Sequence, residues 1–174
     1  MTNPVLVALD VPRLDKAESL ARRLAPHVGG FKVGLELIMS HGPSAVASIA
    51  KLGLPVFADV KLHDIPNTVE ASASAMGAHG ARWVTAHASG GKEMLRAAVR
   101  GLKSGAAEGP VGVLAVTVLT SLDRSDLDAT GTKGDVHDQV LRLGRLAAAT
   151  GAEGVICSPA EVPSLKGISP SLVA

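Results

Sequence analysis

Residues 55–62, Pro55-Val56-Phe57-Ala58-Asp59-Val60-Lys61-Leu62, form an apolar run that ends in alternating charged and apolar residues. A short apolar run of this kind predicts a buried β-strand. Pro66 follows shortly afterwards and predicts the first turn of a helix that continues to about Ala78, because proline is well tolerated at that position. This segment therefore predicts one strand–helix unit with charged side chains where the strand ends.

The same order of strand and helix recurs on both sides of that segment. Strands are expected at Pro4–Asp10, Gly30–Gly34, Pro55–Leu62, Ala81–His87, Val111–Val118 and Glu153–Ser158. Helices are expected at residues 13–26, 43–52, 66–78, 91–103 and 136–150, with a short helix near 160–166, and a polar stretch runs from Leu119 to Gly134. Repeated strand–helix units indicate a parallel sheet, and continuous apolar strands indicate that helices cover its outer face.

Two parallel architectures compete, and the strand ends decide between them. A doubly wound dinucleotide-binding fold expects a glycine-rich turn after the first strand, but the sequence there is Asp10-Val11-Pro12-Arg13. A (β/α)8 TIM barrel expects polar residues at the carboxyl ends of several strands. Residues of that kind are Asp10, Lys32, Asp59, Lys61, His87, Thr117, Thr120 and Ser121. We therefore predict an α/β fold of the TIM-barrel type.

The length of the chain limits how much of such a barrel it contains. It has 174 residues, whereas a complete eightfold barrel usually needs about 250. We expect residues 1–174 to be a single barrel domain that holds about the first six βα units. The seventh and eighth strands and their phosphate-binding loops are then absent.

Composition and charge narrow the class of protein further. There are 17 basic and 16 acidic residues, a formal net charge of +1, which predicts neither a nucleic-acid nor a membrane partner. Met1-Thr2-Asn3-Pro4 does not have the pattern of a signal peptide, and no apolar stretch reaches the roughly 18 residues of a membrane span. The single cysteine, Cys157, excludes an internal disulfide framework or a cysteine-rich metal site, and its apolar run predicts a buried structural cysteine rather than a nucleophile. We expect a soluble, cytoplasmic protein.

The charged residues of the second and third strands are expected to face the barrel interior. Side chains alternate along a strand, so Val60 and Leu62 are expected against the helices, and Asp59 and Lys61 in the barrel mouth. Lys32, between two apolar neighbours in its own strand, is expected to point the same way. Because unpaired buried charges are costly, Lys32, Asp59 and Lys61 are predicted to form one alternating chain of charges.

Each of these residues also has a purely structural interpretation. Asp59 and Lys61 fit a structural ion pair, and Lys32 fits a lysine that extends its ammonium to solvent. Asp64 fits a cap for the following helix, and His87 fits a hydrogen-bonded structural histidine. Their coincidence at the strand ends, where barrel enzymes place their sites, favours an active site.

The segment Asp59-Val60-Lys61-Leu62-His63-Asp64-Ile65-Pro66-Asn67-Thr68 resembles the Asp-x-Lys-x-x-Asp-Ile-Pro-x-Thr motif of the orotidine 5′-monophosphate decarboxylase family. Further similar segments occur in the same order: Val7-Ala8-Leu9-Asp10, Lys32-Val33-Gly34, His87-Ala88-Ser89-Gly90-Gly91 and Val116-Thr117-Val118-Leu119-Thr120-Ser121. The resemblance runs along the whole chain. The first half of the motif also fits related sugar-phosphate decarboxylases and synthases, but the Ile-Pro-Asn-Thr that follows separates the chain from them.

The resemblance implies a reaction and a role for individual residues. The reaction is the decarboxylation of orotidine 5′-monophosphate to uridine 5′-monophosphate, the last step of de novo pyrimidine nucleotide synthesis. Lys61 would protonate C6 of the pyrimidine, and Asp59 would lie against the departing carboxylate. Lys32 would hold Asp59 and contact the ribose, and Asp10 would bind a ribose hydroxyl.

The remaining implied positions concern substrate binding and assembly. Thr120 and Ser121 would lie near the base. Asp64 and Thr68 would reach into the neighbouring subunit's site, so that a homodimer completes it. The resemblance also implies that Ile65 and His87 bind substrate, and that neither a metal nor an organic cofactor takes part.

The resemblance also points to what lies beyond this sequence. In the family, Ser169–Ala174 corresponds to the start of the seventh strand. A Pro-Gly-Ile-Arg turn, a glutamine-bearing lid and a Gly-Arg pair, which grip the phosphate, would follow it. We therefore expect the natural protein to continue, and the 174-residue chain to bind phosphorylated ligands poorly.

Two alternatives to an active decarboxylase stay open at this point. One is a magnesium-dependent sugar-phosphate decarboxylase or aldolase built on the same barrel. It would need a further carboxylate near Lys32, and Glu36 is the nearby candidate. The other is a non-catalytic fragment or nucleotide-binding protein.

Overall fold

The computed structural model describes residues 3–107 and 109–173, and its centre is a parallel sheet of six strands in the order β1-β2-β3-β4-β5-β6. The strands are β1 (Leu6–Ala8), β2 (Gly30–Gly34), β3 (Val56–Leu62), β4 (Ala81–His87), β5 (Gly112–Val116) and β6 (Gly154–Ile156). The strand order equals the chain order, so every connection crosses to the adjacent strand, as in a (β/α) barrel.

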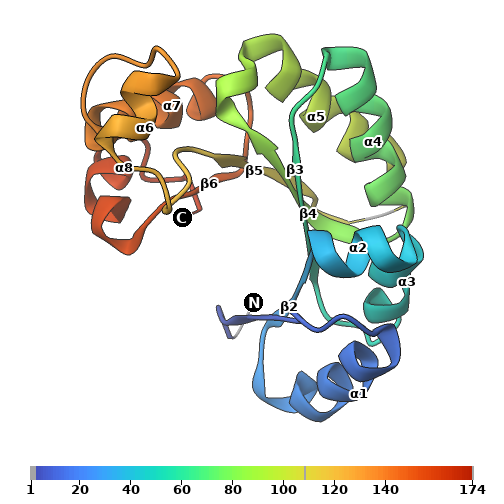
Figure 1. The fold of residues 1–174 in the computed structure, drawn as a ribbon. Helices are drawn as coiled ribbons and strands as arrows, with labels where there is room; N and C mark the ends of the chain where they lie inside the picture. The colour runs from blue at the N-terminus through green and yellow to red at the C-terminus, as the bar shows by residue number, and fades with distance from the viewer. Residues whose placement is uncertain (1–2, 108, 174) are drawn as a thin grey trace.

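Helices connect the strands and lie on the outside of the curved sheet (Figure 1). They are α1 (Leu14–Leu24), α2 (Leu35–His41), α3 (Ser44–Ala50), α4 (Pro66–Ala78), α5 (Lys92–Gly105), α6 (Arg124–Ala129), α7 (Val136–Ala148) and α8 (Val162–Ile168). Short 3-10 turns occupy Ala25–His27, Ala88–Gly90 and Pro159–Glu161. Figure 1 shows that the sheet curls through an open arc with the strands on its concave side, which is the shape of a partial barrel.

Two hydrophobic layers lie on the two faces of the sheet. The larger one packs outward-facing strand residues such as Phe31, Val33 and Val84 against the helices. The smaller one consists of Phe57, Trp83 and Leu114, with Leu6 and Ile156 packed against them. The second layer lines the interior of the arc, so the inner face is apolar towards the beginnings of the strands and becomes polar towards their ends.

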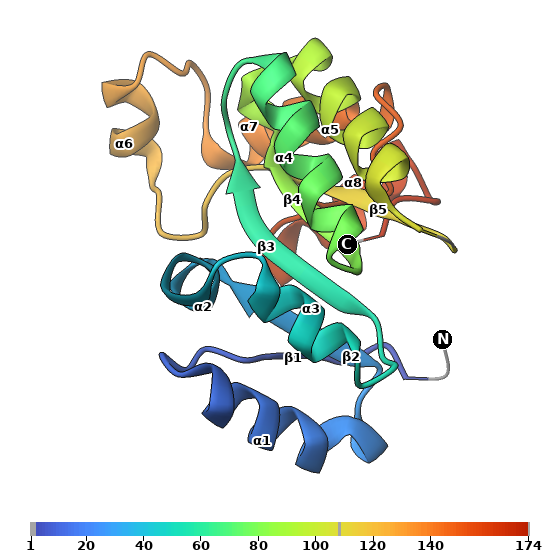
Figure 2. The ribbon, with the colours of Figure 1, turned by 90° about the vertical axis from the view of Figure 1, so that its right-hand side faces the viewer.

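The structure confirms the predicted α/β fold and most of its elements. The predicted bounds of β2, β4 and α4 agree with the structure, whereas β1 and β6 are shorter than predicted, with three residues each. Asp10 therefore lies two residues beyond β1, although the amide of Leu9 still donates to the carbonyl of Lys32 at 2.9 Å. In Figure 2 the long strand β3 runs across the front of the molecule between α2–α3 and α4.

The sequence did not predict the short helices α2 and α6. Helix α2 starts at Leu35, directly after β2, and ends before Gly42, which has a φ of 70°. Helix α6 lies within the stretch predicted to be an irregular polar loop. It begins with a capping box in which Asp123 accepts from the amide of Asp126, and Asp126 accepts from the amide of Asp123.

The last described residues add a further backbone partner to β6. Val173 forms a parallel bridge with Gly154. Its amide donates to Glu153 at 3.0 Å, and its carbonyl accepts from Val155 at 2.8 Å. This bridge lies at the point that the family resemblance assigns to the start of the seventh strand. The prediction of one domain over residues 1–174 includes positions outside the described residues and stays a prediction.

No helix in the described part of the chain combines the length and the apolar character needed to cross a membrane.

Candidate active site

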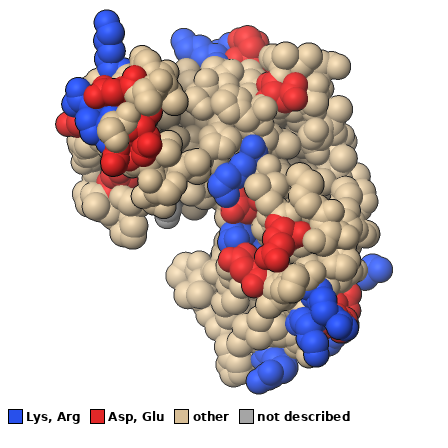
Figure 3. All heavy atoms as spheres, in the orientation of Figure 1, with Lys and Arg blue, Asp and Glu red and all other residues tan. Residues whose placement is uncertain are grey.

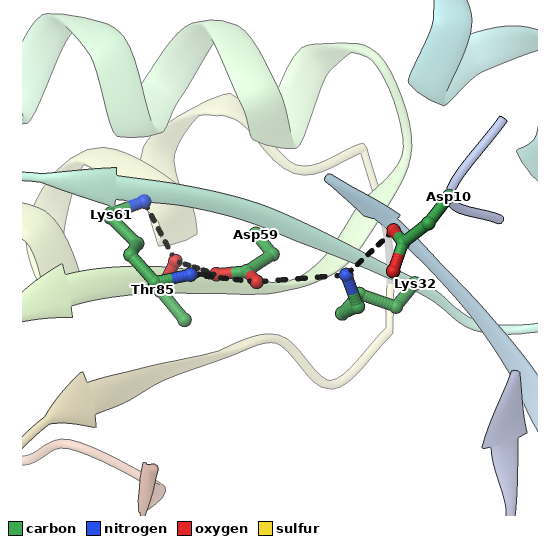
Figure 4. Close-up of polar contacts among 5 residues, drawn as sticks. All are labelled: Asp10, Lys32, Asp59, Lys61 and Thr85. Atoms are coloured by element: carbon green, nitrogen blue, oxygen red, sulfur yellow. Dashed lines mark hydrogen bonds and ion pairs between the residues drawn. The ribbon is translucent and has the colours of Figure 1, made fainter. Parts of the chain in front are cut away.

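Four charged side chains, one from the loop after β1, one from β2 and two from β3, form one alternating chain at the strand ends (Figure 4). Lys61 Nζ lies 2.8 Å from Asp59 Oδ1 and 2.9 Å from Asp59 Oδ2. Lys32 Nζ lies 3.8 Å from Asp59 Oδ2 and 3.1 Å from Asp10 Oδ1. The structure thus contains the predicted alternation of Lys32, Asp59 and Lys61, and Asp10 extends it by one carboxylate.

This chain of charges lines a cavity of about 260 Å³. The lining residues are Leu9, Asp10, Lys32, Gly34, Leu35, Glu36, Leu37, Asp59 and Lys61. Figure 3 shows acidic and basic side chains meeting in the hollow of this face. The side chain of Asp59 is 14% exposed, whereas that of Asp10 is 64% exposed. Charge interactions around Asp59 are therefore screened less by solvent than those at the rim.

A local irregularity of β3 places the two catalytic candidates of that strand. Ala58 pairs with Val84 and Leu62 pairs with Ala86, so three residues of β3 lie opposite the single residue Thr85 of β4. Lys61 has a φ of 47°, the one positive φ of a non-glycine residue in the described chain. Such a backbone conformation is uncommon and costs about 1–3 kcal/mol, and it clusters at functional sites.

Thr85 is the polar residue of this site that sequence reasoning missed. Its side chain is fully buried. Its Oγ1 accepts the Lys61 amide at 2.8 Å and donates to Asp59 Oδ1 at 2.9 Å. Thr85 lies inside the predicted strand Ala81–His87 and was not among the predicted site residues. The sequence did contain a signal for a role in the site, because Thr85 is two residues before His87 and therefore lies on the same face of the strand.

His87 lies beside the charged chain rather than in its cavity. Its ring stacks on that of His63, with centroids 5.2 Å apart and an interplanar angle of 28°. Burial, followed by the positive charges of His63 and Lys61, lowers the pKa of His87 below its usual 6.5, and Asp59 only partly opposes this. The lowered pKa favours a neutral imidazole at neutral pH.

The other predicted site residues do not join this cavity in the described chain. Asp64, Ile65 and Thr68 are all exposed, where β3 leads into α4. Asp64 Oδ1 accepts the amide of Ile65 at 2.6 Å, but α4 has no side-chain cap, so the capping interpretation of Asp64 is wrong. Thr120 and Ser121 are exposed in the loop that follows β5.

The magnesium alternative finds little support in this geometry. Glu36 lines the cavity from the first turn of α2 and is exposed. Among residues 3–107 and 109–173, no three His, Cys, Asp or Glu side chains gather closely enough to hold a metal ion. Two of the three carboxylates that line the cavity are paired with lysines instead, Asp10 with Lys32 and Asp59 with Lys61.

A curled parallel sheet with charged side chains converging at the carboxyl ends of its strands defines a (β/α)-barrel enzyme. The comparison with protein families identifies which one. The model described as "Orotidine 5'-phosphate decarboxylase / HUMPS family" matches residues 3–173, and the chain belongs to that family.

Individual relatives agree with this assignment. The chain is 54% identical over 172 residues to orotidine 5′-phosphate decarboxylase of Anaeromyxobacter dehalogenans (strain 2CP-1), a match that covers 97% of this chain and 74% of the relative. It is 47% identical over 171 residues to the enzyme of the same name from Paramagnetospirillum magneticum, covering 97% and 73%. The crystal structure of orotidine 5′-phosphate decarboxylase from Lactobacillus acidophilus superposes with a TM-score of 0.87 at 37% identity, covering 98% and 79%.

Proposed function

We propose that this chain catalyses the decarboxylation of orotidine 5′-monophosphate to uridine 5′-monophosphate in pyrimidine nucleotide synthesis. The observation that carries the proposal is the alternating chain Asp10–Lys32–Asp59–Lys61 at the carboxyl ends of β1, β2 and β3. The names of the relatives support it, because the matches cover nearly the whole chain. Its single cysteine, Cys157, is free, which fits an enzyme of the cytoplasm, but it is partly exposed, so the prediction of a buried cysteine is wrong.

Lys61 is the proton donor in this proposal. When carbon dioxide leaves, the electron pair of the broken C–C bond stays on C6, where the pyrimidine ring delocalises it poorly. An ammonium beside C6 stabilises that charge as it develops and then transfers a proton to the carbon. The amine left on Lys61 regains a proton from solvent, to which the side chain is 30% exposed.

Asp59 acts on the group that leaves. Two negative charges about 4 Å apart repel each other by roughly 4 kcal/mol at an effective dielectric constant of about 20. The substrate carboxylate beside Asp59 therefore experiences repulsion that ends when neutral carbon dioxide departs. Lys32 and Asp10 bind ribose hydroxyls in this arrangement, and Lys32 also holds Asp59, from which its Nζ is 3.8 Å away.

A homodimer completes the site in this proposal. The cavity of about 260 Å³ is small compared with the 300–1,000 Å³ of typical small-molecule sites. Asp64, Ile65 and Thr68 are exposed where β3 leads into α4, and Ile65 is a large apolar residue with 67% exposure. We assign Asp64 and Thr68 to the site of the neighbouring subunit, and Ile65 also binds substrate. His87, Thr120 and Ser121 bind the substrate within the subunit.

Mixed dimers test the shared site. Asp64→Asn and Lys61→Ala chains are each expected to be nearly inactive alone. A mixed dimer of the two contains one site with intact Lys61 from one chain and intact Asp64 from the other. Mixing is therefore expected to restore a substantial fraction of activity. No recovery in mixtures that do exchange subunits would show that Asp64 acts within its own subunit.

Release of carbon dioxide from carboxyl-labelled orotidine 5′-monophosphate tests the reaction itself. Turnover that persists in excess EDTA is expected. A chain extended by the C-terminal segment of the Anaeromyxobacter relative is assayed in parallel, because that relative is matched over 74% of its length. Turnover by the extended chain alone would assign the 174-residue chain to the inactive-fragment alternative. Inactivity of both would contradict the proposed function.

A sugar-phosphate reaction is the second candidate. The description of the matching family names a second group, HUMPS, beside the decarboxylases, and we take this group to be the sugar-phosphate enzymes of the same barrel. It predicts that the same chain releases carbon dioxide or cleaves a carbon–carbon bond in a phosphorylated sugar acid, and that magnesium is required. Absence of that activity in the presence of magnesium would exclude the sugar-phosphate reaction.

A further inference from the structure

We infer that Thr85 is a positioning residue of this active site, which sets the relative placement of the Lys61 ammonium and the Asp59 carboxylate through its hydroxyl group. The inference rests on the proposed function, because it adds a residue to that reaction. Thr85 is not part of the Asp-x-Lys-x-x-Asp motif and lies on the neighbouring strand β4.

The need for such a residue follows from the irregularity in β3. In a regular parallel ladder, the amide of Lys61 would bond to the backbone of the next strand. Here three residues of β3 face one residue of β4, so the ladder is interrupted between Ala58 and Leu62. An unpaired buried amide costs about 1–3 kcal/mol. The hydroxyl of Thr85 takes the place of the missing backbone acceptor, at 2.8 Å from the amide nitrogen.

The same hydroxyl donates a hydrogen bond to the carboxylate of Asp59. Thr85 Oγ1 donates to Asp59 Oδ1 at 2.9 Å, and Lys61 Nζ donates to that same oxygen at 2.8 Å. A closed ring results, from the Lys61 amide through Thr85 and Asp59 to the ammonium of the same lysine (Figure 4). The ring ties the side chain of Lys61 to its own backbone. The lysine is otherwise a long, flexible side chain, which loses about 2 kcal/mol of conformational freedom when it is fixed.

The environment makes these bonds persistent. Thr85 is fully buried, and the Asp59 side chain is 14% exposed. The Thr85 hydroxyl donates its single hydrogen bond to Asp59 and accepts one from the Lys61 amide. Both groups would therefore lose a hydrogen-bond partner without this hydroxyl. Val84 and Ala86, the chain neighbours of Thr85, face the helices and contribute only packing. The Thr85 hydroxyl therefore contacts the active-site residues directly, whereas Val84 and Ala86 pack β4 against the helices.

The consequence is geometric control of the chemical step. A misplacement of about 1 Å in a reacting group costs up to roughly 100-fold in rate. Thr85→Val, which keeps the shape of the side chain without its hydroxyl, is expected to lower kcat by about 10- to 100-fold while KM changes by less than about threefold. Thr85→Ser, which keeps the hydroxyl, is expected to recover most of the parent kcat.

Thr150→Val is the matched control. Thr150 is also a buried threonine, and its hydroxyl donates to the Ala147 carbonyl at 2.9 Å at the end of α7, away from the charged cavity. That variant loses one buried hydrogen bond and is expected to keep the parent kcat. If Thr85→Val does not fold, Thr85→Ala replaces it with the same expectations.

The experiment measures kcat, KM and the exchange rate of the Lys61 amide in ¹⁵N-labelled parent, Thr85→Val, Thr85→Ser and Thr150→Val chains. A kcat of Thr85→Val within twofold of the parent overturns the inference. A Thr85→Ser chain as slow as Thr85→Val also overturns it, because packing would then explain the loss.

The amide exchange separates this inference from the proposed function. If the parent shows no turnover, the proposed function fails for this chain and the exchange rates decide about Thr85. Exchange that is at least about tenfold faster in Thr85→Val, and close to the parent rate in Thr85→Ser, supports the positioning role. Equal exchange in all variants overturns it.

Discussion

Lys61 donates two hydrogen bonds to the carboxylate of Asp59, at 2.8 and 2.9 Å, although only Val60 separates the two residues along β3. Residues at this spacing share one face of a strand, and the irregularity of β3 brings their polar groups into contact. Asp59 is also the carboxylate that Lys32 approaches from β2. It is thus the common partner of both lysines and of Thr85.

Replacing Asp59 by asparagine is expected to lower both activity and stability. The substitution leaves the ammonium groups of Lys32 and Lys61 without the negative charge between them. Hydrogen bonds to charged groups contribute about 1.5–3 kcal/mol, so the free energy of unfolding should fall by about that amount. Urea denaturation measures it. Asp15→Asn removes an exposed ion pair with Arg13, which solvent screens, and should leave the urea midpoint close to that of the parent. A stability of Asp59→Asn equal to that of the parent would contradict the expectation.

Substitution of Gly101 or Gly105 by alanine is expected to destabilise the α4–α5 contact. A Cβ at Gly101 would overlap the carbonyl of Glu70, and one at Gly105 would overlap that of Ser74. Overpacking of this kind costs about 1–3 kcal/mol. Thermal melting measures the loss.

Gly167→Ala in α8 is the control for this pair, because nothing lies within 4 Å of the added Cβ. Alanine has the higher helix propensity, so this variant should be as stable as the parent or more stable by up to about 1 kcal/mol. If Gly101→Ala and Gly105→Ala melted at the same temperature as Gly167→Ala, the α4–α5 contact would accept the added Cβ atoms without a loss of stability.

Protonation of Glu153 is expected to make the protein less stable in acid. Arg82 binds its carboxylate through two nitrogens at 2.7 and 2.6 Å, and Trp83 Nε1 donates at 3.2 Å. Burial raises the pKa of Glu153, but the hydrogen bonds and charge of Arg82, with the bond from Trp83, outweigh it and hold the pKa below its usual 4.5. The stabilisation is therefore complete above about pH 4.5 and is lost as the pH falls through the lower pKa of the folded state.

Melting temperatures between pH 6.5 and 3.5 test that expectation. Glu153→Gln should be less stable than the parent at pH 6.5, and the difference should shrink as the pH falls. Glu93→Gln, at an exposed pair with Arg96, should show little difference at any pH. A constant difference between Glu153→Gln and the parent would mean that the charge of Glu153 contributes nothing.

His87 is expected to destabilise the fold when the pH falls below about 6.5. Its pKa in the folded state is lowered, chiefly by burial, so the unfolded chain takes up the proton at a higher pH than the folded one. Unfolding therefore becomes easier as the pH falls from about 6.5 through the folded-state pKa. Denaturant midpoints at pH 7.5 and 5.5 should differ less in His87→Gln than in the parent. The exposed His137 provides the control, and an unchanged pH dependence in His87→Gln would contradict the account.

The sequence predicts the order of strands and helices because apolar runs and proline positions are local signals. It also predicts the grouping of Lys32, Asp59 and Lys61, since the ends of neighbouring parallel strands meet at one edge of the sheet. Helix α6 was missed although its signal, an aspartate at each end of a capping box at Asp123 and Asp126, is present in the sequence.

Other features depend on contacts that no local pattern contains. The positive φ of Lys61 arises from the pairing of β3 with β4, and the buried hydroxyl that accepts its amide comes from a residue 24 positions away. Arg82 and Glu153 are separated by 71 positions and meet beside Gly112, where a Cβ would overlap the Glu153 carboxylate. The sequence contains these residues, but only the folded sheet brings them together.

The most direct test of the central claim compares the parent with Lys61→Ala in the presence of orotidine 5′-monophosphate, by following the loss of substrate absorbance in the ultraviolet. The account predicts turnover by the parent, or by its C-terminally extended form. It predicts a loss of at least about 1,000-fold in Lys61→Ala, because both the stabilising charge and the proton donor are removed. Comparable turnover by the parent and Lys61→Ala would contradict the assignment of Lys61, and with it the proposed mechanism.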